Sequence, residues 1–121
     1  MTDDPISEVE DEALTVDDNV VADLVAFRKT SKLEYLPGEN IEAERERLSN
    51  ILNALIDKLI AGVRANPSKL WVLTQFQHSL ELVEGEDTEG REHFGMEIEE
   101  IMDILGIESS DGLLSYYLGG F

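Results

Sequence analysis

Residues 48–63 read LSNILNALIDKLIAGV, and this stretch predicts the longest helix of the chain. Its apolar residues recur at spacings of three and four, which places them on one face of an α-helix. The members of this stripe are Leu48, Ile51, Leu52, Leu55, Ile56, Leu59, Ile60 and Val63. Acidic residues precede the stripe at Glu42, Glu44 and Glu46, as the positive end of a helix favours. We therefore expect a helix over about residues 41–65 to form the centre of the fold.

Further helices are expected around this one, over about residues 18–32, 67–82 and 89–105, with a short last helix after them. Each begins at a residue that suits a helix N-cap: Asp17 or Asp18, Asn66 before Pro67, Asp87 or Thr88, and Ser109 or Ser110. Gly106 suits the left-handed position just past the end of a helix. No run alternates with period two for long enough to form a sheet, so the sequence predicts an all-α fold, a compact bundle of about five helices. The core is expected to centre on Leu52, Leu55, Leu59, Phe76, Ile98, Ile101 and Leu105.

The first 16 residues differ in composition from the rest of the chain. They read MTDDPISEVEDEALTV, with no basic residue and no regular apolar spacing. A segment with so little apolar surface cannot offset the entropy that it loses on ordering. We therefore expect residues 1–16 to form a disordered acidic tail and residues 17–121 to form a single helical domain.

Charge divides the chain into three parts. Residues 1–18 carry eight acids and no base, residues 19–80 carry seven acids and eight bases, and residues 81–111 carry twelve acids and one base. The net charges of the parts are therefore −8, +1 and −11, within a total of −18. Such a field repels phosphate and anionic lipid and attracts basic groups. We expect a basic protein partner, and no binding of nucleic acid or membrane.

Composition also excludes several classes of protein. The chain has no Cys, so disulfides, thiolate catalysis and Cys-ligated zinc are excluded. Its acidic start lacks the basic region and apolar run of a secretory signal, and no stretch approaches 18 apolar residues. These features are typical of a cytoplasmic protein.

Residues 101–121, IMDILGIESSDGLLSYYLGGF, resemble the C-terminal block of a small bacterial family, the domain of unknown function 4844. The stretch LNALIDKLI at residues 52–60 and the pair Asn66-Pro67 are similar to that family too. The resemblance extends over roughly residues 40–121 and is most specific from Leu105 to Leu114. It implies a bacterial helical domain. It implies no activity, because the family has no assigned one, so no functional residue can be carried over.

The helix expected over residues 89–105 carries the candidate binding site. Six of its residues project away from the apolar side of that helix: Glu89, Glu92, Met96, Glu99, Glu100 and Asp103. Like charges four positions apart oppose the helix by about 0.2–0.5 kcal/mol per pair. Met96 is an adaptable apolar group among these carboxylates. The set resembles a small interface with an apolar anchor and a charged rim, and a solvated acidic face with one exposed Met is the alternative.

A metal site is a second interpretation of the same helix. Glu89, His93 and Glu97 share one flank at four-residue spacing, which offers oxygen and nitrogen ligands. Helical di-iron sites, however, repeat a Glu-x-x-His pair on two helices, and neither His of this chain has a Glu three residues before it. We therefore expect a solvated flank, with no metal and no cofactor. No phosphate loop or nucleophile motif occurs, so no catalytic residue is expected.

Three glycines fall inside the expected helices. Gly62 projects onto the apolar face of the central helix, and Gly90 and Gly95 flank the apolar stripe of the helix over 89–105. Glycine in a helix costs about 1 kcal/mol relative to Ala. We expect each of the three to permit close approach of a neighbouring helix. For Gly90 and Gly95 a hinge is the less favoured alternative.

Three functions remain open at this stage. The first is a non-catalytic binder of a basic protein, as a bacterial immunity protein blocks a nuclease-type toxin. The second is a structural or regulatory interaction domain, such as a homodimer formed through exposed Trp71, Tyr116, Tyr117 and Phe121. The third is an enzyme whose acidic site has no recognisable motif. We favour the first, because the chain is small and acidic and carries no catalytic motif.

Overall fold

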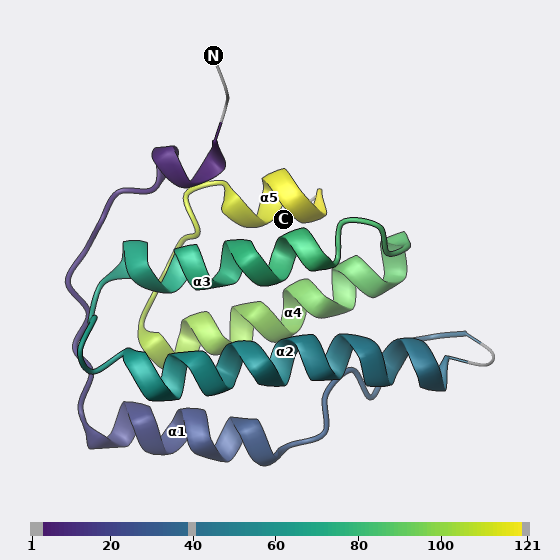
Figure 1. The fold of residues 1–121 in the computed structure, drawn as a ribbon, viewed down its shortest axis with the longest axis horizontal. Coiled ribbons are helices and arrows are strands. Elements are labelled where there is room, and N and C mark those ends of the chain that lie inside the picture. The colour runs from purple at the N-terminus through teal and green to yellow at the C-terminus, as the bar shows by residue number, and fades with distance from the viewer. Residues whose placement is uncertain (1–3, 39–40, 120–121) are drawn as a thin grey trace.

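The computed structural model describes residues 4–38 and 41–119. In this part of the chain, four long helices run side by side and a short fifth helix lies next to α3 (Figure 1). The helices are α1 (Asp18–Lys29), α2 (Glu42–Gly62), α3 (Lys69–Leu82), α4 (Thr88–Leu105) and α5 (Leu113–Leu118), preceded by the 3-10 helix η1 (Pro5–Glu8). The prediction of an all-α bundle of about five helices is confirmed.

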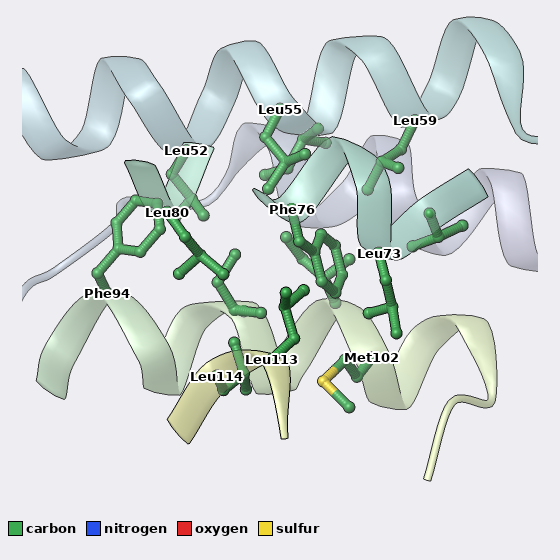
Figure 2. Close-up of a cluster of buried hydrophobic side chains, with 14 of the residues drawn as sticks. Leu52, Leu55, Leu59, Leu73, Phe76, Leu80, Phe94, Met102, Leu113 and Leu114 are labelled. Carbon is green, nitrogen blue, oxygen red and sulfur yellow. The ribbon is translucent and has the colours of Figure 1, made fainter. Parts of the chain in front are cut away.

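Helix α2 lies at the centre of the bundle, where it packs against α1, α3 and α4. Its fully buried side chains are Leu48, Leu52, Leu55, Ile56 and Leu59. Figure 2 shows Leu52, Leu55 and Leu59 pointing toward the side chains of α3 and α4, with Phe76 in the middle of the cluster. All seven residues expected at the centre of the core are at most 3% exposed. The predicted core is therefore confirmed.

Local sequence signals set several helix ends. The carboxylate of Asp17 accepts a hydrogen bond from the amide of Val20 at 3.0 Å, and so caps α1. Asp87 caps α4 in the same way, with the amide of Gly90 at 2.8 Å. Gly106 ends α4 with a φ of 74°, in the left-handed region that residues with a Cβ rarely adopt. These positions confirm the boundaries predicted there.

The start of α3 differs from the prediction. The helix begins at Lys69 with Ser68 as its N-cap, two residues later than the predicted start at Asn66 and Pro67. Asn66 instead closes α2, because its side-chain amide and its backbone N–H both donate to the carbonyl of Gly62 at 3.0 Å. A polar residue between two helices can cap either of them, and the spacing alone does not decide which.

The last helix also begins later than expected. Its N-cap is Gly112, with a φ of 90°, rather than Ser109 or Ser110. Ser110 still supports the first turn, because its carbonyl accepts from the amide of Leu113 and its hydroxyl from the amide of Leu114.

Residues 4–16 lie against the bundle. This arrangement differs from the disordered tail that the sequence predicted for residues 1–16. Residues 1–3 are outside the described part of the chain. Helix η1 contacts α3 and α5, and the chain then passes the turn between α2 and α3 (Figure 1). There the amide of Leu14 donates to the carbonyl of Pro67 at 2.8 Å, in an isolated bridge between Ala13 and Ser68. The composition of the segment gave no sign of this, because the bonds use backbone groups.

The same segment supplies part of the cap that α3 needs. The first amides of a helix have no acceptor within the helix. In α3, the amide of Lys69 donates to the carbonyl of Glu12 at 2.9 Å, and the amide of Leu70 donates to the carboxylate of Asp11 at 3.0 Å. The bond from Leu70, followed by one from the hydroxyl of Ser68, lowers the pKa of Asp11. The start of α3 is therefore completed by residues from the far N-terminal part of the chain.

Asp111 joins this segment to the loop between α4 and α5. Lys69 is 4% exposed, and its ammonium lies 2.8 Å from the carboxylate of Asp111. The same carboxylate oxygen accepts from the amide of Glu10 at 3.1 Å. Asp111 has a φ of 53°, a conformation that few residues other than glycine adopt. Its pKa is lowered from the ordinary value of 3.8, first by the hydrogen bond from Lys69 and then by the bond from Glu10.

Helices α2 and α3 approach closely at Gly62. A Cβ added to this glycine would lie 2.7 Å from the ring of Trp71, closer than real Cβ atoms come to another group. The indole therefore occupies the space that a side chain at position 62 would need. The prediction that Gly62 permits close helix packing is confirmed.

Deletion of residues 1–16 should lower the melting temperature. The deletion removes the acceptors of the first two amides of α3, and hydrogen bonds contribute about 0.5–1.5 kcal/mol each. A loss of 1 kcal/mol corresponds to about 2–8 °C for a domain of this size, so differential scanning calorimetry should register a drop of at least about 2 °C. An unchanged transition would mean that the segment contributes nothing to stability.

Substitution Asp111→Asn should destabilise the protein at pH 7 by about 1–3 kcal/mol, because Lys69 loses a charged acceptor. The folded-state pKa of Asp111 is lowered, so its contribution is complete above the ordinary value of 3.8 and disappears as the pH falls through the lowered value. The gap in melting temperature between wild type and variant should therefore close as the pH is taken from 7 towards 2. Glu108→Gln, at an exposed neighbouring position, serves as the control and should leave no such gap.

Substitution Gly62→Ala should displace the indole of Trp71. Trp71 is the only Trp of the chain, so the fluorescence emission maximum reports its surroundings directly. We expect a red shift and an altered near-ultraviolet circular dichroism spectrum, because the half-buried ring must move away from the new methyl group. Gly85→Ala is the matched control, since nothing lies within 4 Å of a Cβ added there. Identical spectra for all three proteins would contradict the close contact.

Candidate functional site

The candidate site is a surface that we call the acidic face of α4. It consists of six residues, all exposed in the structure: Glu89, Glu92, Met96, Glu99, Glu100 and Asp103. Spacings of three, four and seven return a helical residue to the same side, so the six share one side of α4. Met96 is 52% exposed among the carboxylates. All six residues singled out from the sequence therefore lie on one surface.

The opposite side of α4 fixes this orientation. Its buried side chains are Phe94, Ile98, Ile101, Met102 and Leu105. Helix α4 packs against α1, α2 and α5, and Figure 2 shows Phe94 and Met102 within the central cluster. Rotating the helix would bring these side chains into water, at a cost of about 1.5–3 kcal/mol for each one that became fully exposed. The acidic face is therefore held outward by the core.

Close packing against α2 also holds α4 in place. A Cβ added at Gly90 would lie 2.7 Å from a carboxylate oxygen of Glu44 and 3.5 Å from Leu48. These distances show that side chains of α2 lie against Gly90, and Gly95 is buried as well. Burial raises the pKa of Glu44, and the charge of Asp87 adds to the rise.

Most of the basic residues are engaged away from the acidic face. Five of them form ion pairs with carboxylates elsewhere: Arg28 with Asp57, Arg45 with Glu42, Arg47 with Glu86, Arg64 with Asp18, and Lys69 with Asp111. Across residues 4–38 and 41–119, the one contact of the face with a basic side chain joins Glu89 to the imidazole of His93, at 3.9 Å, and it is an ion pair only when that imidazole is protonated. The other four carboxylates of the face have no ion-pair partner in that part of the chain. The face therefore keeps its negative charge.

Glu97 lies beside the acidic face but has different surroundings. It is half-buried, and burial raises its pKa while the charge of Lys32 opposes the rise. Lys32 is 3% exposed, and its ammonium donates to the carbonyls of Phe27 at 2.5 Å and Thr30 at 2.6 Å. Burial lowers the pKa of Lys32. Glu97 is therefore electrostatically coupled to the cation that closes the end of α1.

This arrangement bears on the metal alternative. Glu89 and His93 approach each other to 3.9 Å, whereas Glu97 is half-buried and interacts with the charge of Lys32. No three carboxylate or imidazole groups of the described residues are grouped so as to hold a metal ion. The three side chains of that alternative do not form a ligand set here.

Two hollows border the C-terminal half of the acidic face. One, of about 210 Å³, is lined by Glu99 together with Glu108 and three serines. The other, of about 330 Å³, is lined by Asp103 together with Glu12. Glu12 and Glu108 lie outside the helix, so helical spacing could not predict that they border the face. The one sequence signal for them was the concentration of acidic residues in the segments 1–18 and 81–111, to which they belong.

The aromatic surface expected for a homodimer is smaller than predicted. Tyr117 is buried, at 8% exposed, and Trp71 is half-buried against Gly62, so the prediction that both are exposed is wrong. Tyr116 is 59% exposed, with its ring 5.0 Å from that of Tyr117. Phe121 lies outside the described residues. The short last helix buries one of its two tyrosines against the bundle, because tyrosine is large enough to add to the core.

The comparisons with known proteins give one result. Neither a curated protein nor a solved structure matches the chain. No helix within the described residues is both long enough and apolar enough to cross a membrane. A family model, described as a domain of unknown function (DUF4844), matches residues 15–121, and so includes α1 as well as the part from about residue 40 that carried the resemblance. Because this match covers most of the sequence, the chain belongs to the DUF4844 family.

Proposed function

We propose that this protein is a non-catalytic binding domain that engages a basic protein through the acidic face of α4. One observation carries the proposal: Glu92, Glu99, Glu100 and Asp103 are exposed around a half-exposed Met96, and no base of the described residues pairs with them. Like charges on one helix face repel each other. A partner that supplies lysine or arginine removes this repulsion when it binds.

The two hollows suit basic side chains of such a partner. Glu99 and Glu108 line one of them, and Asp103 and Glu12 line the other. A guanidinium group pairs with carboxylates through two parallel hydrogen bonds, and it retains its charge when partly buried. Met96 would provide the apolar contact between the charged groups. In this proposal, charge sets the association rate and the apolar contact slows dissociation.

The biological role that we favour is that of an immunity protein in a bacterial cytoplasm. A nuclease-type toxin carries a basic surface, because it must bind the phosphates of nucleic acid. An acidic protein of this size can block that surface without any chemistry of its own. A toxin gene directly upstream in the genome would support this role over other kinds of binder.

An enzymatic role has less support from the geometry. In acid–base catalysis by two carboxyl groups, the two groups lie in one site but in different environments, so that their pKa values differ. Among the residues that the structure describes, two carboxyl groups have raised pKa values, Glu44 and Glu97, and both are outside the acidic face. Glu44 contacts α4 near Gly90, about 10 Å along the helix from Glu97 at a rise of about 1.5 Å per residue. This separation favours a binding function.

Neutralising the acidic face should slow association with the partner. The test variant combines Glu92→Gln, Glu99→Gln, Glu100→Gln and Asp103→Asn, and the partner is first isolated from the native host with the wild-type protein as bait. Surface plasmon resonance over a salt series should show an association rate reduced about tenfold or more at low salt. The difference should shrink as salt rises, because the Debye length falls from about 10 Å at 0.1 M to about 3 Å at 1 M.

A matched control variant distinguishes the effect of the acidic face on the association rate from the effect of the net charge of the chain. Asp23→Asn, Glu34→Gln, Glu46→Gln and Glu84→Gln remove the same number of exposed carboxylates from other elements. This control should associate nearly as fast as wild type, whereas Met96→Ala should mainly accelerate dissociation. Equal rates for the two quadruple variants would show that the acidic face is not the contact surface.

A further inference from the structure

A groove between α2 and α3 has a character unlike the rest of the surface. Its volume is about 280 Å³, and eight residues line it: Asn50, Ile51, Ala54, Leu55, Lys58, His78, Ser79 and Leu82. Leu55 and Ser79 are buried and form its floor, while Ala54, Lys58 and His78 are exposed along its sides. Leu82 is 68% exposed and adds apolar surface to the rim of the groove. The groove therefore combines an apolar surface with two basic side chains.

None of the eight lining residues carries a carboxylate. Four other hollows of comparable size each contain at least two, among them Asp4 and Glu8 in one and Glu42 and Glu46 in another. The chain as a whole has 27 acids. A groove without acid is therefore a local exception in a strongly acidic protein.

Contacts at both ends of the groove fix the position of α2 relative to α3. Gly62 allows α2 and α3 to approach closely at the end where Trp71 lies. At the opposite end, Arg47 of α2 holds Glu86 of the α3–α4 loop through hydrogen bonds of 2.6–2.9 Å. The groove is thus bounded by two fixed helices, and it shares no residue with the acidic face of α4.

We propose that this groove binds a helical segment of a second partner, in which an apolar side chain is flanked by carboxylates. The apolar side chain would pack between Ile51 and Leu82, and a carboxylate would pair with Lys58. Lys58 has no ion-pair partner among the residues described here, unlike the five bases paired elsewhere. Charge complementarity therefore favours an acidic occupant. Amphipathic helices bind grooves in this way through anchors spaced three or four residues apart.

The net charge of −18 does not prevent such binding at physiological salt. The Debye length is then about 8 Å, so acids more distant than this from the groove are largely screened. Lys58 and His78 line the groove, so they lie close enough to a bound segment to contact it directly. Rising salt should therefore weaken binding in the groove less than it weakens binding of a basic partner to the acidic face.

Nuclear magnetic resonance with two designed peptides tests the proposal. Both probes are amphipathic helices of about 15 residues with the same leucine anchors, one flanked by Glu and the other by Lys. The Glu-flanked peptide should shift the amide signals of Ile51, Ala54, Lys58, His78 and Leu82 in the labelled full chain. It should leave the signals of the acidic face of α4 in place. The Lys-flanked peptide should not occupy the groove.

Two variants at exposed positions check the contacts without disturbing the core. Leu82→Ser and Lys58→Glu should each weaken binding of the Glu-flanked peptide about fivefold or more, and Lys29→Glu on α1 should not. The absence of groove shifts at millimolar peptide, or equal binding of both peptides in the groove, would overturn the proposal. Sedimentation that shows a wild-type dimer, lost in Leu82→Ser, would also overturn it by assigning the groove to a second copy of the chain.

Discussion

Five side chains of α2, namely Leu48, Leu52, Leu55, Ile56 and Leu59, are at most 1% exposed. They reach this burial because α1, α3 and α4 all pack around the same helix. Each such side chain contributes about 1.5–3 kcal/mol when fully buried, so the five together are comparable with the net stability of a small domain. Helices α1, α3 and α4 are positioned by their contacts with this stripe, and α5 packs in turn on α3 and α4. The outward direction of the acidic face of α4 and the closeness of α2 and α3 at the groove both follow from it.

The N-terminal segment supplies hydrogen-bond acceptors that the start of α3 lacks. At the start of α3, the N-cap residue Ser68 supplies one side-chain acceptor, because its hydroxyl accepts a hydrogen bond from the amide of Trp71. Asp11 and Glu12 supply acceptors for the two preceding amides, and Asp111 holds both Lys69 and the amide of Glu10. A buried ammonium or a helix amide without an acceptor would cost free energy here. Acidic residues that look like a solvated tail are therefore used here as hydrogen-bond acceptors.

The pairing of charges within the chain gives two parts of the surface a different electrostatic character. Five bases are neutralised by carboxylates of α1, α2 and the connecting loops, and Lys32 is satisfied by backbone carbonyls. This pairing leaves the acidic face of α4 without counter-charges. It also leaves the groove between α2 and α3 with Lys58 and no carboxylate. The chain is thus strongly acidic overall without being uniformly acidic at its surface.

The sequence by itself determined the helices, the core and the acidic face of α4, because each depends on periodicity along one helix. Helical spacing placed Leu55 and Ile98 inside, placed Glu92 and Met96 outside, and marked Gly106 as an end. Tertiary structure alone decided where α3 begins, that residues 4–16 follow the bundle, and that Tyr117 is buried. It also decided the positive φ of Asp111, and which carboxylates join the hollows beside α4. These features depend on hydrogen bonds and contacts between residues far apart in the chain, and such pairings leave no periodic pattern in one sequence.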